Sequence, residues 1–214
     1  MNAIKTKVKM SKLQATLIWE FATYRWHAYA YEGYMEGECF EKIDIEWANS
    51  EFNNNNPIAK VHIIRIPYDK NPRNQNLFNG CWDTVTRLND ECGELAVITD
   101  TIFGADTSIT KRIREQLTKN DLYYIARIQV IPELRGFGFG ADILKNLHQI
   151  LAIHAREDNP VMVLIPSAFE FKELTREYEE MLGRLISWYM RNGFTLAGEA
   201  FGQEVLVLEK SLPK

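Results

Sequence analysis

The residues with the clearest chemical potential form a glycine-rich segment just past the middle of the chain. It reads VIPELRGFGFGA over residues 130–141, with Arg135, Gly136, Gly138 and Gly140 at its centre. A β-branched, aromatic run precedes it and an amphipathic helical pattern follows, so the segment is expected to join a strand to a helix. Such a turn directs backbone N–H groups outward at the positive end of the helix dipole, and glycines let a phosphate approach them. The pattern therefore predicts a phosphate-binding turn.

Several interpretations of this turn compete. The Walker type requires a lysine followed by Ser or Thr after its last glycine, and the chain has neither there. A dinucleotide fingerprint is formally present as Gly136, Gly138 and Ala141, but the next strand ends in Pro-Ser-Ala over residues 166–168, without the acid that would hold a ribose. A turn that merely closes a strand onto a helix, with no ligand, remains open.

A further interpretation, that of an acyl-CoA site, rests on a wider pattern. The residues Pro132-x-x-Arg135-Gly136-x-Gly138-x-Gly140 resemble motif A of the GCN5-related N-acetyltransferase (GNAT) superfamily. In that motif Arg/Gln-x-x-Gly-x-Gly/Ala holds the pyrophosphate of acetyl-CoA.

A second match lies downstream. Tyr189-x-x-x-Gly193-Phe194 resembles the Tyr-x-x-x-Gly-Phe of motif B, at the end of the last long helix. A helix, a strand and a helix separate the two motifs, in the order typical of the superfamily. The resemblance is specific over residues 122–208, weaker over 78–103 and absent before residue 78.

The resemblance implies an α+β fold of layered α/β/α type, the GNAT acyl-CoA N-acyltransferase fold. Its central sheet would be mixed and mostly antiparallel, with a strand pair splayed by a β-bulge near residues 128–130. Acetyl-CoA, or another acyl-CoA, would be the co-substrate. The strand edge would pair with the pantetheine arm and the turn would bind the pyrophosphate through backbone N–H groups. The implied cofactor-binding residues are Ile128, Gln129, Val130, Arg135, Gly136, Phe137, Gly138, Phe139, Gly140 and Ala141.

Three side chains are candidates for catalysis. Tyr189 matches the tyrosine with which many superfamily members protonate the leaving thiolate, although a core tyrosine on the same helical face is the alternative. Gln129 shares a strand face with Arg127. Active members commonly carry a glutamate nearby on this strand, and an amide cannot act as a base. Ser167 would orient a water or the amine, or else cap the following helix. The general base is thus unassigned.

The resemblance implies an N-acyltransferase that acts on an amine of a small molecule or a protein. The alternative is a GNAT-fold protein without turnover, which senses acyl-CoA or binds a partner. A nicotinamide-dependent oxidoreductase is a remote third class. Superfamily members often form homodimers, but the fold does not decide this.

Length, composition and net charge further narrow the kind of protein that this chain can be. The chain has 214 residues, 46% of them hydrophobic and 25% charged, with three cysteines and a formal net charge of −4. These values suit a globular protein and argue against nucleic acid or an anionic membrane as partner. The sequence shows no apolar run of about 18 residues, no secretory leader and no metal-type spacing of its four histidines. We therefore expect a cytoplasmic protein with reduced thiols and no metal.

Periodicity predicts the elements and their grouping. Residues 1–76 are expected to be a β-rich segment that partly joins the sheet, and residues 77–214 the acyl-CoA-binding core of one continuous domain. The expected strands are 13–24, 39–47, 59–67, 122–131, 161–165, 194–198 and 204–209. The expected helices are 78–102, 142–155 and 171–189. Residues 95–101 could instead be a short strand, and 106–119 are expected to be a loop with one helical turn.

Overall fold

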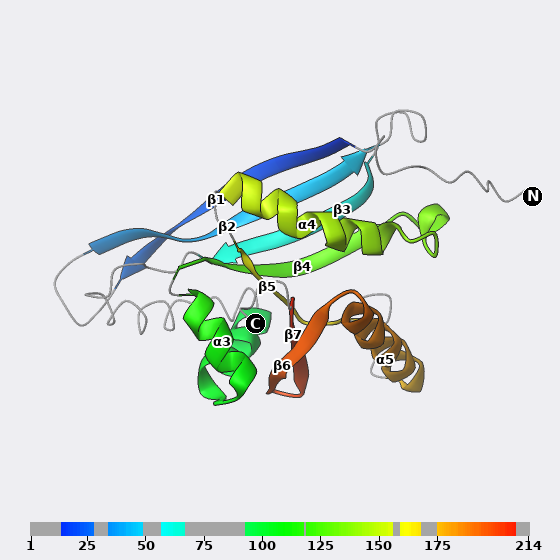
Figure 1. The fold of residues 1–214 in the computed structure, drawn as a ribbon. Helices are drawn as coiled ribbons and strands as arrows, with labels where there is room; N and C mark the ends of the chain where they lie inside the picture. The colour runs from blue at the N-terminus through cyan, green and yellow to red at the C-terminus, as the bar shows by residue number, and fades with distance from the viewer. Residues whose placement is uncertain are drawn as a thin grey trace, which may run out of the picture.

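One mixed sheet organises the chain (Figure 1). The computed structural model describes residues 14–27, 34–48, 57–66, 93–117, 119–155, 159–167 and 175–208. The seven described strands follow the order β1-β2-β3-β4-β5-β7-β6. They are β1 (Gln14–His27), β2 (Tyr34–Ala48), β3 (Pro57–Ile66), β4 (Leu122–Val130), β5 (Val161–Leu164), β6 (Phe194–Ala200) and β7 (Gln203–Leu208). All neighbours pair antiparallel except β4 and β5, which are parallel.

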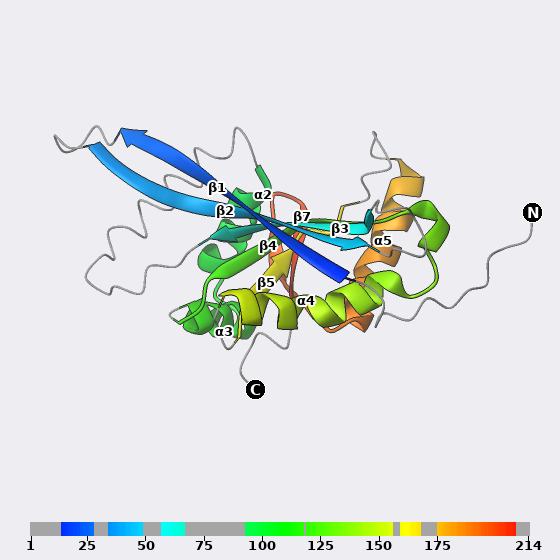
Figure 2. The ribbon, with the colours of Figure 1, turned by 90° about the horizontal axis from the view of Figure 1, so that it is seen from above.

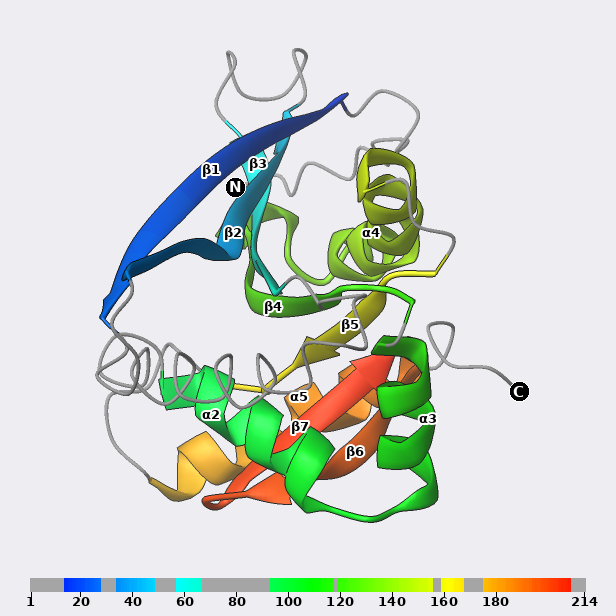
Figure 3. The same ribbon diagram turned by 90° about the vertical axis from the view of Figure 1, so that its left-hand side faces the viewer.

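Helices cover both faces of this sheet. They are α2 (Gly93–Thr99), the π-helix η4 (Asp100–Gly104), α3 (Ser108–Leu117), the 3-10 helix η5 (Pro132–Leu134), α4 (Phe139–Ala155) and α5 (Arg176–Arg191). Figure 3 shows α2 and α3 in front of β6 and β7, with α5 behind them. The predicted α+β class with a mixed, mostly antiparallel sheet is confirmed.

The alternation of side chains along the central strands produces two cores. Met162 and Leu164 of β5 pack in the cluster that includes α4, whereas Val161 and Val163 pack in the cluster that includes α2 and α3. All four residues of β5 are buried, as expected of a central strand covered on both faces. The apolar run over residues 161–164 is therefore explained by its position in the middle of the sheet.

The two parallel strands separate soon after they meet. β4 and β5 pair only over Leu122–Tyr124, and β4 then continues to Val130 with β3 on its other edge. The β3–β4 register changes because Ala126 is an extra residue, between the pairs His62↔Arg127 and Ile63↔Ile125. A bulge of this kind bends its strand and increases the local twist. The bulge predicted at residues 128–130 therefore exists, but it lies at Ala126.

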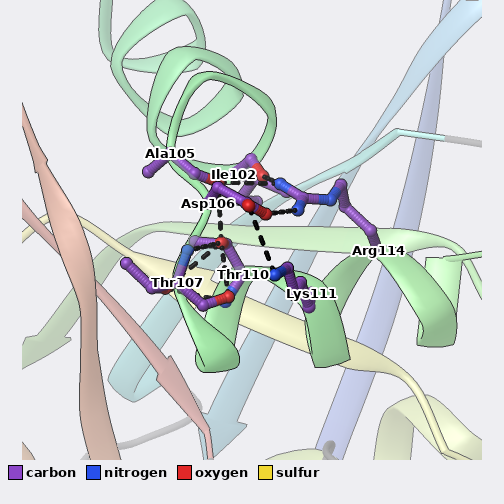
Figure 4. Close-up of polar contacts among 7 residues, drawn as sticks. All are labelled: Ile102, Ala105, Asp106, Thr107, Thr110, Lys111 and Arg114. Atoms are coloured by element: carbon purple, nitrogen blue, oxygen red, sulfur yellow. Dashed lines mark hydrogen bonds and ion pairs between the residues drawn. The ribbon is translucent and has the colours of Figure 1, made fainter.

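The segment expected to be a loop after residue 106 forms the ten-residue helix α3. Its start is fixed by Thr107, whose Oγ1 accepts from the Thr110 amide, while Thr110 Oγ1 donates to the Ala105 carbonyl. Arg114 reaches back to donate to the carbonyls of Ile102, at 2.7 Å, and Ala105, at 2.8 Å (Figure 4). The helix was missed because its many polar residues obscure the apolar stripe of Ile109, Ile113 and Leu117.

The other expected elements agree with the structure to within a few residues. Residues 93–104 are helical in α2 and η4, so the alternative strand over 95–101 is wrong. The remainder of the expected helix over 78–102 lies outside the described residues, as do residues 171–174 of the last expected helix. The division into segments 1–76 and 77–214 stays a prediction.

A buried ion pair ties the start of β4 to the end of β3. Arg65 Nε and Nη2 both donate to Asp121 Oδ2, at 2.8 and 2.5 Å, and Asp121 is 3% exposed. The Asp121 carbonyl also accepts from the Val161 amide at the start of β5. This residue therefore joins three strands just before β4 enters the region of the glycine turn.

We predict that Asp121→Asn lowers the free energy of unfolding by about 3 kcal/mol, because loss of one partner leaves the other charge uncompensated. The measurement is urea unfolding with unchanged slope. Asp106→Asn is the matched control, since the Asp106 side chain is 74% exposed in its ion pairs with Lys111 and Arg114, and exposed pairs contribute less than about 1 kcal/mol. Equal losses in the two variants would show that the Asp121 pair has no special structural role.

Candidate functional site

A groove of about 790 Å³ opens where β4 leaves β5. Its walls come from β4, the glycine turn, the start of α4, the segment after β5 and one face of α5. Figures 1 and 2 show the turn and α5 at the same end of the molecule. The lining residues are 125–130, 134–136, 138–141, 165, 167, 181, 185, 188 and 189. The structure therefore brings together all the candidate site residues except Phe137, which is 57% exposed and outside the lining.

The edge of β4 that faces the groove carries backbone groups from alternate residues. The Ile131 amide donates to the Ile58 carbonyl of β3, at 3.0 Å. In an antiparallel pair these bonds alternate, so Gln129 and Arg127 also direct their backbone groups toward β3. Ile128 and Val130 consequently direct their backbone N–H and C=O groups toward the opposite edge, where β5 has separated. The Gln129 backbone thus faces β3 and Gln129 lines the groove, while its expected part in cofactor binding stays a prediction.

The Arg135 side chain binds the last residue of this strand edge. Its Nε donates to the Val130 carbonyl at 3.0 Å, so that carbonyl is already engaged. The Arg135 amide donates to the Pro132 carbonyl at 3.2 Å within the 3-10 turn. The Arg135 amide, which was expected to contribute to phosphate binding, is therefore already engaged within the chain.

Two glycines give the turn its shape. Gly136 and Gly138 have φ values of +79° and +89°, a region that L side chains rarely adopt. A Cβ built on either residue would meet no atom within 4 Å. Gly138 also caps α4, because its carbonyl accepts from the Asp142 amide in the first bond of the helix. The first amides of α4 then have no intrahelical acceptor and lie at the positive end of a 17-residue helix.

The third glycine, Gly140, lacks a side chain where another residue packs against its backbone. A Cβ on Gly140 would lie 3.0 Å from Trp188 Cζ2 and 3.2 Å from Cη2. The indole of α5 thus sits directly against the backbone of α4 at its first turn. This close approach sets the spacing of the two helices across the groove.

Tyr189 lies beside that indole and is 9% exposed. Its ring meets Trp188 and Phe194 edge-on, with centroids 4.9 and 5.5 Å away. Burial raises the pKa of its phenol from 10.0 to about 12, because desolvation disfavours the phenolate. Tyr189 is therefore both a core residue and a groove residue, and its hydroxyl is protonated at neutral pH.

Two further candidates also lie in the groove. Ser167 follows β5, and the role suggested for it as a helix cap belongs at α5 to Thr175, whose Oγ1 accepts from the Tyr178 amide at 3.3 Å. The Gln129 side chain is exposed on the strand face that it shares with Arg127. The described lining therefore offers a hydroxyl, an amide and a phenol beside the strand edge.

Several lining residues were not predicted. Met181, Leu185 and Trp188 face the groove from α5, and their spacing of four and three residues is that of one helical face. Helical spacing of this kind is visible in a sequence, but it does not distinguish a groove-lining face from a core face. Leu134 and Ile165 carried no signal, because their position depends on how the turn and β5 fold together.

The described part of the chain lacks two other kinds of feature. It contains no group of three or more His, Cys, Asp or Glu side chains placed to hold a metal ion. No described helix combines the length and apolar character needed to cross a bilayer.

Comparison with known proteins gives little further information. No protein family matches this chain by sequence, and no curated protein does. Among solved structures the chain is similar to an acetyltransferase of the GNAT family from Listeria monocytogenes 4b F2365, at 17% sequence identity and a TM-score of 0.30. The match covers 69% of this chain and 94% of that one. A likeness this low carries no argument about the fold or activity of this chain.

The contact between Gly140 and Trp188 yields a double-mutant prediction. Gly140→Ala is expected to destabilise the protein by about 1 kcal/mol, because the added methyl overpacks the indole. In a Trp188→Leu background the same change is expected to be neutral or stabilising, as Gly→Ala normally is in a helix. Chemical unfolding of the four proteins measures the coupling. A Gly140→Ala effect that is the same in both backgrounds would contradict the close packing.

Proposed function

We propose that this chain binds an acyl-coenzyme A and transfers the acyl group to an amine. The observation that carries the proposal is the open backbone edge of β4 at Ile128 and Val130, which leads directly into the glycine turn and the start of α4. An extended ligand that contains amides and has an anionic end would match this arrangement, because its amides could pair with the strand edge and its anion could bind at the turn and the helix start. The motif resemblance in the sequence points to the same ligand.

The strand edge suits the pantetheine arm, which carries two amides. Ile128 offers a backbone donor and an acceptor, while Val130 offers its N–H because its carbonyl is held by Arg135. Main-chain hydrogen bonds of this kind add a ligand to a sheet as if it were a strand. Since β5 pairs with β4 only up to Tyr124, the ligand would occupy the place that β5 vacates.

The glycine turn suits the pyrophosphate. Side chains are absent at Gly136 and Gly138, and the space that a Cβ would enter contains no protein atom within 4 Å. The amides at the first turn of α4 add donors and a favourable dipole for an anion. The groove thus offers its anion-binding groups at one end and its strand edge along its length.

The bound thioester would supply an activated carbonyl carbon. An amine attacks that carbon, a C–N bond forms and the C–S bond breaks to release the coenzyme A thiolate. The proton that the nitrogen loses passes through water to that thiolate, which leaves as the thiol. The groove would hold the two reactants in line, and positioning of this kind supplies much of the acceleration in acyl transfer. Ser167 lies in the groove wall, where its hydroxyl oxygen could accept a hydrogen bond from the amine or its hydroxyl could donate to a water.

Tyr189 would donate a hydrogen bond to the leaving sulfur rather than surrender its proton completely. An alkyl thiol such as cysteine has a pKa of about 8.5, well below the pKa of about 12 that burial gives the Tyr189 phenol. Complete transfer from the phenol to the thiolate would therefore be uphill. A hydrogen bond to developing negative charge still lowers the barrier.

A second candidate function is acyl-CoA binding without turnover. Gln129 favours it, because a carboxamide on this face of β4 cannot accept the proton that the amine loses. The two functions share one ligand site and differ only in turnover.

The ligand site is tested by Gly138→Trp, paired with Gly202→Trp. Both glycines have positive φ, +89° and +73°, and neither Cβ would meet an atom within 4 Å, but Gly202 lies in the β6–β7 turn. Each variant is expected to lose about 1–2 kcal/mol of stability from backbone strain. Calorimetry with acetyl-CoA is expected to show binding to the wild type and to Gly202→Trp, and none to Gly138→Trp. Retained affinity in Gly138→Trp would place the anion elsewhere.

The role of Tyr189 is tested by Tyr189→Phe, with Tyr178→Phe on the same helix as the control. We expect Tyr189→Phe to lower kcat by about tenfold or more, the effect of losing a hydrogen bond to a charged group, with little change in acetyl-CoA affinity. Because its pKa is raised to about 12, the kcat profile is expected to show no decline from Tyr189 below about pH 11. An unchanged kcat in Tyr189→Phe would assign this tyrosine to the core alone.

A further inference from the structure

The glycine turn and the start of α4 carry two phenylalanines with opposite surroundings. Phe139 is 6% exposed and packs in the core cluster that includes α4. Phe137, two residues earlier, is 57% exposed and lies outside the groove lining. A single apolar side chain on a protein surface has no meaning by itself. The position of Phe137 between the two glycines of the turn gives it one.

The backbone on either side of Phe137 forms the candidate anion site. Gly136 and Gly138 both have positive φ, whereas Phe137 does not. Successive N–H groups in turns of this kind form concave sites that bind anions. The groove lining includes both glycines and omits Phe137. The Phe137 side chain therefore lies at the rim of the anion site, outside the groove.

The order of the groups in coenzyme A brings its nucleoside to that rim. The proposed function pairs the pantetheine arm with β4 as far as Val130 and binds the pyrophosphate at the glycine turn. The nucleoside is attached to the other end of the pyrophosphate, so it must continue past the turn. Figures 1 and 2 show the segment between β4 and α4 at one end of the molecule. The nucleoside would consequently leave the groove beside Phe137.

The chemistry of the phenyl ring favours the base over the sugar. The base is the planar aromatic part of coenzyme A, whereas the ribose and its phosphate are polar. Stacking of a base on an aromatic side chain contributes about fivefold or more to affinity. Phenylalanine has no hydrogen-bonding group, so this contact would depend on the face of the base and not on its edge.

We propose that Phe137 stacks on the nucleobase of coenzyme A where the nucleotide leaves the groove. The acyl donor is then a thioester linked to a nucleotide, rather than the phosphopantetheine thioester of a carrier protein. The inference rests on the proposed function, because that function places the pyrophosphate at the glycine turn.

Calorimetry with two thioesters isolates the contribution of the nucleoside. One ligand is acetyl-CoA, and the other is S-acetyl-4′-phosphopantetheine, which has the same thioester arm and one phosphate but no nucleoside. We expect the wild type to bind acetyl-CoA more tightly. Because the two ligands also differ in their phosphates, variants of Phe137 are needed to assign part of that difference to the ring.

Two substitutions separate the aromatic ring from apolar bulk. Phe137→Leu is expected to weaken acetyl-CoA binding about fivefold or more, while affinity for the phosphopantetheine thioester changes less than about twofold. Phe137→Tyr retains a ring that can stack and is expected to bind both ligands within about twofold of the wild type. Phe201→Leu is the matched control, since Phe201 is 76% exposed beside the positive-φ Gly202 and lies outside the groove lining.

The outcomes separate this inference from the proposed function. If Phe137→Leu leaves acetyl-CoA affinity unchanged, or weakens both ligands equally, the ring does not contact the base and the inference is overturned. Failure of Phe137→Tyr to bind acetyl-CoA as the wild type does would overturn it too. Each of these results leaves the proposed function intact. Failure of the wild type to bind either thioester would overturn both.

Discussion

The limited pairing of β4 with β5 is the constraint on which the site depends. The two strands run parallel over only three residues of β4, from Leu122 to Tyr124, and the bulge at Ala126 bends β4. Beyond that point the backbone groups of Ile128 and Val130 face a groove instead of a strand. An interior strand edge with unmet hydrogen-bonding groups is costly in a folded protein. Its presence beside a glycine turn is the basis of our proposal that a ligand pairs with this edge.

The rest of the structure maintains that opening. The Arg65–Asp121 pair fixes the start of β4, and Arg135 holds the Val130 carbonyl at its end. Trp188 packs on the backbone at Gly140, so α5 forms a wall of the groove without closing over the turn. The sheet, the turn and α5 thus position one continuous set of groups: donors for an anion, a strand edge for amides, and polar side chains at the far end.

Much of this arrangement could be predicted because its signals are local. The β-branched run before the turn, the glycines and the apolar period of α4 each specify their own element, and their order along the chain places the turn at a helix start. The helix α3 was missed because its apolar residues are few. Its start depends on contacts of Thr107, Thr110 and Arg114 with the carbonyls before it, which no periodicity reveals.

The details of the site were harder to predict because they depend on pairing between distant segments. Whether Gln129 offers its backbone or its side chain is decided by its register with Lys60, almost seventy positions earlier in the sequence. Likewise, the Arg135 amide becomes engaged by the Pro132 carbonyl only when the 3-10 turn forms. The residues around the glycine turn could therefore be named from the sequence, while the fold decides which of their atoms face the groove.

The central claim is that coenzyme A pairs with the open edge of β4. Backbone amide NMR of the protein titrated with acetyl-CoA tests it most directly. The account predicts that the amide protons of Ile128 and Val130 shift and become protected from exchange, whereas the Gln129 amide, which is bonded to β3, changes little. Binding of acetyl-CoA without an effect at Ile128 and Val130, or with an equal effect at Gln129, would contradict the account.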